Sequence, residues 1–263
     1  MGFIRSTHRG KFEVDADQKL GSLISNAIIL SQLEAFFAAC APGEYLVDIG
    51  CGTRPYAILY QRHFRLAFGF DVSTSPHDLS LADFLAEAPT MPLPASLFDC
   101  ALCTEVLEHV PEPGQALNEI ARVLKPGGWL VLTVPLLLGL HEEPYDYYRY
   151  TVHGLRYLLS RAGFEVERVQ TKGEMLAVVL STLIGPWLKL WFMVSKLTRQ
   201  SWLYSGRNPV LWFTVILPQL FYLAWFQTVQ RYQHAWPGRL YRRLEYVTLG
   251  YVVIARRMTR ISN

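Results

Sequence analysis

The stretch that decides the fold is Leu46-Val47-Asp48-Ile49-Gly50-Cys51-Gly52-Thr53. Its apolar start, together with Tyr45, is typical of a short buried strand. The strand leads directly into Gly50 and Gly52, which tolerate positive φ and let the backbone approach a ligand closely. We therefore expect a strand followed by a tight turn that binds a ligand. The alternative is a tight turn without a ligand, because a Gly-x-Gly pair alone is weak evidence.

Short apolar strands and helices alternate on both sides of this turn. A helical pattern covers roughly residues 17–39, and further helices are expected at 114–124 and 151–162. The expected strands are 45–49, 66–70, 79–82, 98–103, 129–134, 164–169 and 249–255. This alternation predicts an α/β fold, a Rossmann-like, parallel-dominated seven-stranded sheet with helices on both faces. A hydrophobic helical insertion separates the last two strands. Ligands bind such sheets at the carboxyl ends of the strands.

An acidic residue after the second strand indicates a nucleotide. Asp71 lies 19 residues beyond Gly52, and a carboxylate at that place can accept both hydroxyls of a ribose. A dinucleotide fingerprint has its third glycine at position 55, where this chain has Pro55, so pyrophosphate binding is disfavoured. The alternative is that Asp71 only caps a helix.

Three stretches carry a family resemblance. Residues 46–53 resemble the first motif of class I S-adenosylmethionine-dependent methyltransferases, and FDCALCTEVLEHV at 98–110 is similar to their fourth-strand motif. EIARVLKPGG at 119–128 is similar to the helix and turn before their fifth strand. The resemblance covers about residues 46–169, with 249–256 as a last strand, and the chain resembles the type 11-like members.

The resemblance implies S-adenosylmethionine as the cofactor. The residues that it assigns are Asp48, Gly50 and Gly52 around the aminocarboxypropyl end, Asp71 at the ribose, Val72, Asp83 and Phe84 at the adenine, and Thr104 near the sulfonium. Many members have a third glycine where this chain has Arg54. An arginine there could itself reach the cofactor carboxylate.

Two polar segments after strands are candidates for catalysis. His109 is a candidate general base, or else it only positions its own segment. The loop HEEPYDYYRYT, which starts at His141, contains two further candidates, His141 and Asp146, and tyrosines that would form a wall for the acceptor. The alternative is that Asp146 pairs with Arg149 across one turn and Thr151 caps the next helix.

The cysteines and the N-terminus indicate a reducing compartment. Cys100 and Cys103 form a Cys-x-x-Cys, but residues three apart on a strand point to opposite faces, so we expect core residues and no metal site. The four cysteines lack the spacing of a secreted scaffold. Residues 1–19 contain no apolar run that would predict a signal peptide.

Residues 171–248, between the last two expected strands, differ in composition from the rest. From Met175 to Leu244 there is no Asp or Glu, whereas eight Lys and Arg give +8. Because the whole chain carries +3, the remainder carries −5. This insertion also holds six of the seven tryptophans. A basic, apolar segment on an acidic body calls for a separate explanation.

The insertion contains two apolar blocks. Met175–Val194 is interrupted by Lys189, and Pro209–Phe226 has no charge. About twenty helical residues reach about 30 Å, the thickness of a bilayer core. Pro186 and Pro218, near the middle of the blocks, predict kinks or breaks. The basic residues between the blocks favour the cytoplasmic side.

Both ends of the insertion return to one sheet, so they must lie on the same side of any membrane. We therefore expect a broken hairpin that dips into one leaflet at the cytoplasmic face of a membrane, held by interfacial tryptophans and basic residues. One alternative is an anchor that spans the membrane twice. Another is a soluble helical lid or a dimer interface.

The predicted domains are an N-terminal helical segment at 1–40, the S-adenosylmethionine-binding core at 41–173, the insertion at 174–245, and the last strand and tail at 246–263. The predicted function is methyl transfer from S-adenosylmethionine to a small or lipid-linked acceptor at a membrane surface, without nucleic acid. The alternative is a non-catalytic, membrane-tethered module that binds the cofactor or a partner. The sequence leaves the acceptor atom and the oligomeric state open.

Overall fold

The computed structural model describes residues 23–198, 209–232 and 247–259. The chain divides into two compact units, one formed by 30–170 and 250–263 and the other by 1–29 and 171–249. We call them the sheet unit and the insertion unit, and each is described by itself. The first part of the helix expected at 17–39 lies outside the described residues. The predicted domain boundaries stay a prediction.

The sheet unit is built on a seven-stranded sheet in the order β3-β2-β1-β4-β5-β7-β6. Its strands are β1 (Gly43–Ile49), β2 (Phe64–Asp71), β3 (Phe84–Leu85), β4 (Phe98–Thr104), β5 (Leu124–Pro135), β6 (Phe164–Thr171) and β7 (Gly250–Arg257). The pairs from β3 to β5 are parallel, and β7 runs antiparallel to β5. The predicted fold class is confirmed. The order reverses at β1, so the carboxyl ends of β1 and β4 are the expected place for a ligand.

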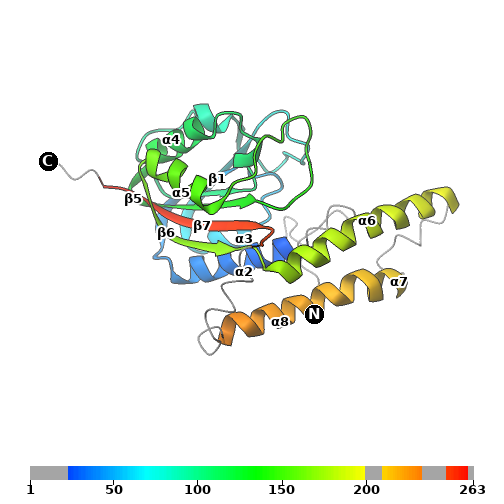
Figure 1. The fold of residues 1–263 in the computed structure, drawn as a ribbon. Helices are drawn as coiled ribbons and strands as arrows, with labels where there is room; N and C mark the ends of the chain where they lie inside the picture. Colours follow the sequence, from blue (N-terminus) through cyan, green and yellow to red (C-terminus); the bar gives the residue numbers. More distant parts are fainter. Residues whose placement is uncertain (1–22, 199–208, 233–246, 260–263) are drawn as a thin grey trace. The chain divides into compact units, whose positions relative to one another are not determined.

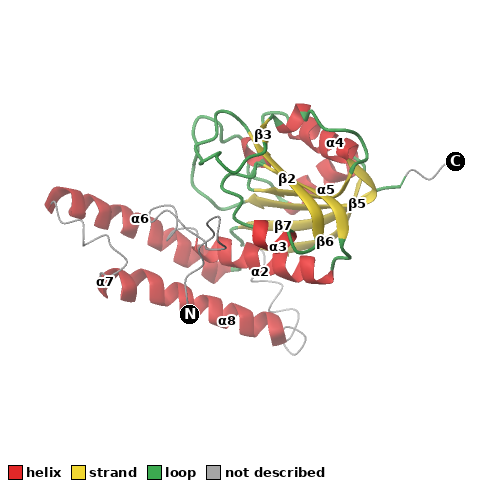
Figure 2. Ribbon diagram, turned by 180° about the vertical axis from the view of Figure 1, so that it is seen from behind, coloured by secondary structure: helices red, strands yellow, loops and turns green. Residues whose placement is uncertain are grey.

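Helices cover both faces of this sheet (Figure 1). The helices and 3-10 turns of this part are α2 (Leu23–Ala39), α3 (Ala57–Tyr60), α4 (Pro113–Val123), α5 (Val152–Arg161), η1 (Ala88–Thr90) and η2 (Leu107–His109). α4 and α5 lie on one face, and α4 is amphipathic with its apolar side buried. On the other face Phe36 of α2 meets Trp129 of β5 edge to face. Figure 2 shows the same layers from behind. Thr151 caps α5, as expected, by accepting a hydrogen bond from the Gly154 amide at 3.1 Å.

The third strand differs from its prediction. It was expected at 79–82, but β3 is Phe84–Leu85 and pairs with Phe70 and Asp71 of β2. Residues 79–82 instead form a turn, in which the Ala82 amide donates to the Leu79 carbonyl at 3.0 Å. The turn brings Asp83 beside β2, where its Oδ2 accepts a hydrogen bond from the Gly69 amide. β3 begins at the next residue, Phe84.

The insertion unit is helical. Its described helices are α6 (Met175–Thr198), α7 (Pro209–Leu211), the π-helical η4 (Trp212–Ile216) and α8 (Leu217–Tyr232). A buried cluster joins α6 and α8 to the first turns of α2, and its members are Ile24, Ile28, Ala177, Tyr222, Phe226 and Leu249. Of the kink or break expected at Pro186, the break is absent, because α6 continues through this residue. Ahead of Pro218, which has no amide hydrogen, the helix passes through the π-helical turn.

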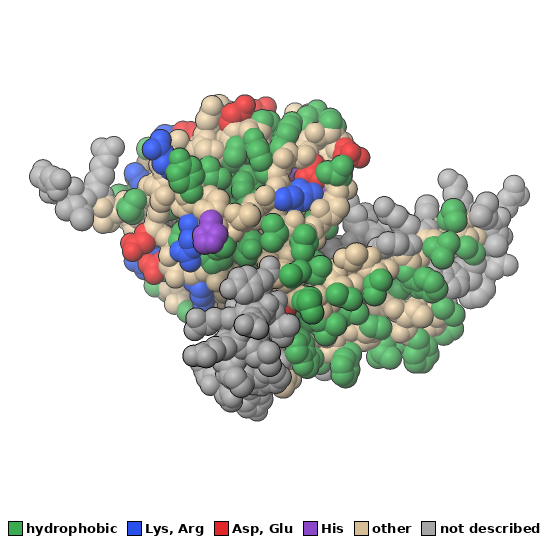
Figure 3. Space-filling view, in the orientation of Figure 1, with side chains coloured by type: hydrophobic (Ala, Val, Ile, Leu, Met, Phe, Trp, Pro, Cys, Tyr) green, Lys and Arg blue, Asp and Glu red, His purple; other side chains and the backbone are tan. Residues whose placement is uncertain are grey.

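Many large apolar side chains of the insertion unit face solvent. Figure 3 shows hydrophobic side chains gathered over α6 and α8. The exposed members are Met175, Leu176, Val179, Leu183, Trp187, Leu190, Met193, Val210, Trp212, Phe213, Leu217 and Phe221. We call these side chains the apolar face. Within the described ranges, no helix combines the length and apolar character needed to cross a bilayer.

Candidate functional site

The glycine turn after β1 has the backbone that its sequence predicts. Gly50 and Gly52 have φ of +63° and +47°. A Cβ at Gly50 would lie 2.3 Å from the Val106 Cγ2, so no side chain fits there. The turn therefore packs closely against the segment that follows β4.

Asp71 ties the end of β2 to this turn. Its Oδ2 accepts a hydrogen bond from the Gly52 amide at 2.8 Å, and its Oδ1 accepts one from the Val72 amide at 2.7 Å. Each carboxylate oxygen can accept more than one hydrogen bond, so the group can hold the turn and still accept ribose hydroxyls. Asp71 therefore accepts hydrogen bonds from the glycine turn and from Val72, and these are not the contacts of a helix cap.

Asp48 is buried beneath the turn, where its Oδ2 accepts a hydrogen bond from the Tyr60 hydroxyl at 2.9 Å. Burial raises the pKa of Asp48 to about 7, against the lowering effects of the Tyr60 hydroxyl and the Arg54 charge; nearby Asp71 raises it further. An unfolded Asp48 loses its proton at a lower pH, so the free energy of unfolding falls as pH rises from about 4 to about 7.

Replacing Tyr60 with phenylalanine will destabilise the protein more at high pH than at low pH. The lost hydroxyl stabilises ionised Asp48, so its removal raises the pKa of Asp48 further and makes ionisation more costly. We expect an additional loss of about 1.5–3 kcal/mol at about pH 8 relative to about pH 5. Urea unfolding at both pH values measures it, with Tyr157→Phe on the exposed side of α5 as the control. An equal loss at both pH values would contradict the assignment.

Arg54 is held by the backbone of β2 and by Asp83. Its Nη2 donates to the Ala67 carbonyl at 2.9 Å, and its Nη1 lies 3.1 Å from the Asp83 Oδ2. Asp83 in turn accepts from the Gly69 amide at 2.7 Å. Both side chains thus hold β2 and its following turn together. Arg54 is not free to bind the cofactor carboxylate in this conformation, and the Asp83 carboxylate has structural partners.

The other predicted cofactor residues lie along the same part of the sheet. Val72 follows β2, and Thr104 ends β4 in register with Thr133 of β5. Phe84 is half-buried and stacks on Phe70, with ring centroids 5.2 Å apart. The structure brings Asp48, Gly50, Gly52, Asp71, Val72 and Thr104 to the carboxyl ends of β1, β2 and β4. Their roles toward the cofactor stay predictions.

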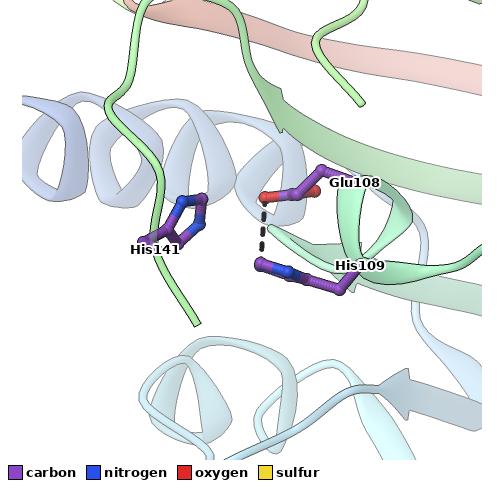
Figure 4. Close-up of side chains that lie close together, drawn as sticks. All are labelled: Glu108, His109 and His141. Carbon is purple, nitrogen blue, oxygen red and sulfur yellow. Dashed lines mark ion pairs between the residues drawn. The ribbon is translucent and has the colours of Figure 1, made fainter. Parts of the chain in front are cut away.

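Glu108, His109 and His141 gather where η2 meets the loop after β5, and we call them the acceptor-side cluster (Figure 4). One donor atom from each residue lies within 4.8 Å of the others. The two imidazole rings meet edge to face with centroids 4.7 Å apart. Two residues predicted separately, His109 and His141, are therefore neighbours.

Backbone and carboxylate oxygens orient both imidazoles. The Nδ1 of His109 lies 2.7 Å from the Tyr145 carbonyl, and the Nδ1 of His141 lies 3.3 Å from the Gly139 carbonyl and 3.4 Å from the Asp146 Oδ2. The Nη2 of Arg149 also lies 3.4 Å from the His141 Nδ1, and the His109 Nε2 lies 3.8 Å from the Glu108 Oε1. Burial, followed by the neighbouring His109, lowers the pKa of His141. His141 is thus held neutral.

Asp146 lies behind His141 and is paired. Its two oxygens are 2.6 and 2.7 Å from the Nη1 and Nη2 of Arg149, and this pairing holds the pKa of Asp146 well below its usual range. Its Oδ2 also accepts from the His141 amide at 3.1 Å. The ion pair considered as the alternative is present, and a catalytic role of Asp146 stays a prediction.

The tyrosines of this loop divide into two groups. The Tyr148 and Tyr150 hydroxyls donate to the carbonyls of Pro111 and Leu107 at 2.8 and 2.9 Å. These contacts fasten the loop to η2 and its flank. Tyr145 and Tyr147 remain exposed, and they are the members available for the predicted acceptor wall.

Sequence reasoning missed His77 and Glu142. The His77 Nε2 lies 3.3 Å from the Glu142 Oε1, a contact that raises the pKa of His77 and lowers that of Glu142. The His77 ring would contact a Cβ at Gly52 at 3.4 Å, and the other oxygen of Glu142 lies 3.9 Å from the His109 Nε2. These contacts connect the glycine turn to the acceptor-side cluster. The only available signal was that His77 follows β2 at the same sheet edge as Asp71.

Comparison with known proteins matches the sheet unit to one family. The family model of a methyltransferase domain matches residues 25–169. A ubiquinone biosynthesis O-methyltransferase of Paracidovorax citrulli is 33% identical over 101 residues, which cover 34% of this chain and 42% of the relative. One of the same name from Coxiella burnetii is 27% identical over 128 residues, covering 45% and 52%. The chain spans about half the length of these relatives.

Solved structures show the same fold. The [4+2]-cyclase SpnF superposes with a TM-score of 0.53 at 22% identity, over 89% of this chain and 81% of the cyclase. An S-adenosylmethionine-dependent methyltransferase from Archaeoglobus fulgidus gives a TM-score of 0.52 at 13% identity, over 88% and 93%. At such identities the likeness concerns the fold alone.

Proposed function

The chain belongs to the methyltransferase-domain family, and from this membership we propose that it transfers the methyl group of S-adenosylmethionine to a hydroxyl oxygen of a small acceptor. This family membership supports the class of enzyme and the cofactor that the motifs predict. What we propose is the kind of acceptor, the groups that remove its proton and the membrane at which the enzyme acts. When bound, the cofactor supplies a methyl group on a positively charged sulfur.

One observation carries the proposal: the acceptor-side cluster lies next to the glycine turn, where we expect the cofactor to bind. The glycine turn and the buried Asp71 fit a nucleoside with an amino acid tail. Through His77 and Glu142 the turn connects to His109 and His141. An acceptor held there lies between a methyl donor and groups that can take its proton, which is the arrangement that displacement requires.

The names of the relatives support an oxygen acceptor. Two of them are ubiquinone biosynthesis O-methyltransferases, and we carry over the acceptor atom and a quinone-precursor type of molecule as a proposal. The exposed rings of Tyr145 and Tyr147 suit a flat aromatic acceptor. A neutral His141 suits removal of a hydroxyl proton.

We further propose that the enzyme works at the cytoplasmic face of a membrane, with the insertion dipping into one leaflet. The apolar face supports this, because contiguous exposed apolar surface on a soluble protein marks an interaction site. The excess of +8 between Met175 and Leu244 complements anionic lipid. A lipid-linked acceptor would be reached there without leaving the bilayer.

The membrane proposal predicts that charge on the apolar face releases the protein from lipid. Phe213→Glu together with Phe221→Glu should weaken binding to vesicles of phosphatidylcholine and phosphatidylglycerol at least about tenfold, because each exposed ring loses about 1.5–3 kcal/mol of burial. Vesicle sedimentation measures it, and Tyr157→Glu, an equally exposed ring of the sheet unit, is the control. Wild-type protein that stays in the supernatant as a dimer would instead make this face a dimer interface.

Transfer itself is tested with radiolabelled S-adenosylmethionine and membranes that contain the protein, with Asp71→Ala membranes as the control. The products are separated into organic, aqueous and protein fractions. We expect label in the organic fraction only with the intact protein. Label solely in the aqueous fraction would overturn the lipid-linked acceptor, and tight cofactor binding without label in any fraction would overturn methyl transfer.

A further inference from the structure

Two loops of the sheet unit meet through one ion pair, which we call the His77–Glu142 bridge. His77 lies in the loop 72–83 after β2, and Glu142 lies in the loop 136–151 after β5. Their closest atoms, the His77 Nε2 and the Glu142 Oε1, are 3.3 Å apart. This contact raises the pKa of His77 and lowers that of Glu142, so each side chain favours the charged form of the other. The bridge therefore joins the two loops by a charged contact.

The His77 side chain lies against the glycine turn. A Cβ at Gly52 would lie 3.4 Å from the His77 Cδ2 and 3.6 Å from the His77 Cβ, so the imidazole lies where the turn has no side chain. Besides Glu142, the charge of Asp71 also raises the pKa of His77, and the Asp71 Oδ2 accepts from the Gly52 amide at 2.8 Å. His77 is thus a neighbour of both residues that we expect to hold the tail and the ribose of the cofactor.

Glu142 has a backbone conformation that residues with side chains rarely adopt. Its φ is +52°, in the left-handed region that favours glycine, and the Tyr145 amide donates to its carbonyl at 3.1 Å. Such a conformation persists only where the surroundings hold it, and it is frequent at functional sites. The Oε1 of Glu142 reaches His77, and its Oε2 lies 3.9 Å from the His109 Nε2. Glu142 therefore links the cofactor side of the site to the acceptor side.

The loop after β5 is itself fastened, so the bridge ties His77 to a held segment. The Arg149 guanidinium donates to the carbonyls of Leu138 and Gly139 at 3.2 and 3.1 Å. A cofactor held at the glycine turn lies beside the His77 ring, and a ring joined to a second loop is less free to move away. Because a bound molecule leaves such a site when the flanking loops move apart, the bridge opposes release.

We propose that the His77–Glu142 bridge retains bound S-adenosylmethionine and opens each time the cofactor, or the product that remains after transfer, leaves the site. His77 and Glu142 are positioning residues, since they hold the loop after β5 against the cofactor side and exchange no group with the substrates. This inference rests on the proposed function and deepens it, because it assigns the step that replaces spent cofactor. Loss of either side chain then speeds cofactor release.

The test measures how fast the full-length protein releases radiolabelled S-adenosylmethionine into an excess of unlabelled cofactor, without acceptor. We expect His77→Ala to release the label at least about fivefold faster, because a charged hydrogen bond is lost. The amide of His77→Gln can still donate to Glu142, so this variant should release the label at an intermediate rate. His153→Ala, an exposed histidine on α5, is the control and should stay within about twofold of the unaltered chain.

Glu142→Gly separates retention of the cofactor from stability of the fold. Glycine adopts a φ of +52° without strain, so the relief of strain offsets the lost contact and the variant should melt close to the unaltered chain. Its release of label should nevertheless be at least about fivefold faster. Glu143→Ala removes an exposed carboxylate from the same loop and, as the matched control, should leave the rate unchanged. A lower melting temperature with an unchanged release rate would assign Glu142 to the fold alone and overturn the proposal.

The double variant His77→Ala/Glu142→Gly shows whether the two side chains act together. Its release should be no faster than that of the faster single variant, because either change alone removes the contact. In the transfer assay these variants should raise the KM for S-adenosylmethionine more than they lower kcat. Single-variant effects that multiply in the double variant, or unchanged release in folded single variants, would overturn the bridge.

Failure of this inference differs from failure of the proposed function. Unchanged release in the variants, with label transferred normally, would leave methyl transfer standing and remove the bridge from cofactor exchange. Faster release in the variants, with no label transferred even by the unaltered chain, would keep the bridge and remove the function.

Discussion

Replacing His109 and His141 together with glutamine will lower turnover by about 10²–10⁴-fold. The two rings meet edge to face with centroids 4.7 Å apart, and they are the groups that we propose to take the hydroxyl proton of the acceptor. Cofactor affinity should change little, because neither ring touches the glycine turn directly. Single-turnover rates at saturating labelled cofactor measure the effect, and calorimetry measures the cofactor affinity.

His153→Gln is the control, since it is a histidine on the exposed side of α5. Its turnover should match that of the unaltered chain. Full turnover of the folded double variant would show that the proton leaves by another route, and the acceptor-side cluster would then have no part in the chemistry.

Asp71→Ala will lower the affinity for S-adenosylmethionine at least about tenfold. A charged hydrogen bond to a ribose hydroxyl is worth about 1.5–3 kcal/mol. The structure adds a second reason, because the Asp71 carboxylate also accepts from the Gly52 and Val72 amides. The substitution therefore loosens the turn as well as the ribose contact. Titration calorimetry with S-adenosylmethionine measures the affinity, and thermal melting shows how far the fold is affected.

Asp71→Asn separates the two contributions. Asparagine keeps an oxygen for one amide but loses the charge, so its affinity should fall between those of the alanine variant and the unaltered chain. Asp78→Ala, in the exposed part of the same loop, should bind the cofactor normally. Unchanged affinity in Asp71→Ala would remove the ribose assignment.

Much of the fold was predictable because its signals are local. The buried run before Gly50 and the helix start at Thr151 depend on neighbours a few residues away, and both are where the sequence placed them. One element that such local signals did not place correctly is β3. Its start depends on Asp83 bonding to Gly69 of β2, a contact between strands that periodicity does not contain.

The sequence indicated individual residues of the candidate site but not which of them lie close together. His109 and His141 were each singled out from their segments, but their meeting depends on the loop after β5 folding back onto η2 through Tyr148 and Tyr150. The contacts of Asp146 with Arg149 and with the His141 amide are likewise made within this loop. Whether a carboxylate is free or paired is decided by the side chains packed around it.

From the sequence alone, the strand, turn and helix signals along the chain predicted the order of the elements. The resemblance of residues 46–53, 98–110 and 119–128 to family motifs predicted the class of enzyme and the cofactor. The tertiary structure decided which polar groups share a site. His77 with Glu142, and Glu108 with His141, come from loops that follow different strands. Parallel strands bring their carboxyl ends to one sheet edge, and at that edge proximity and charge, rather than distance along the chain, set the chemistry.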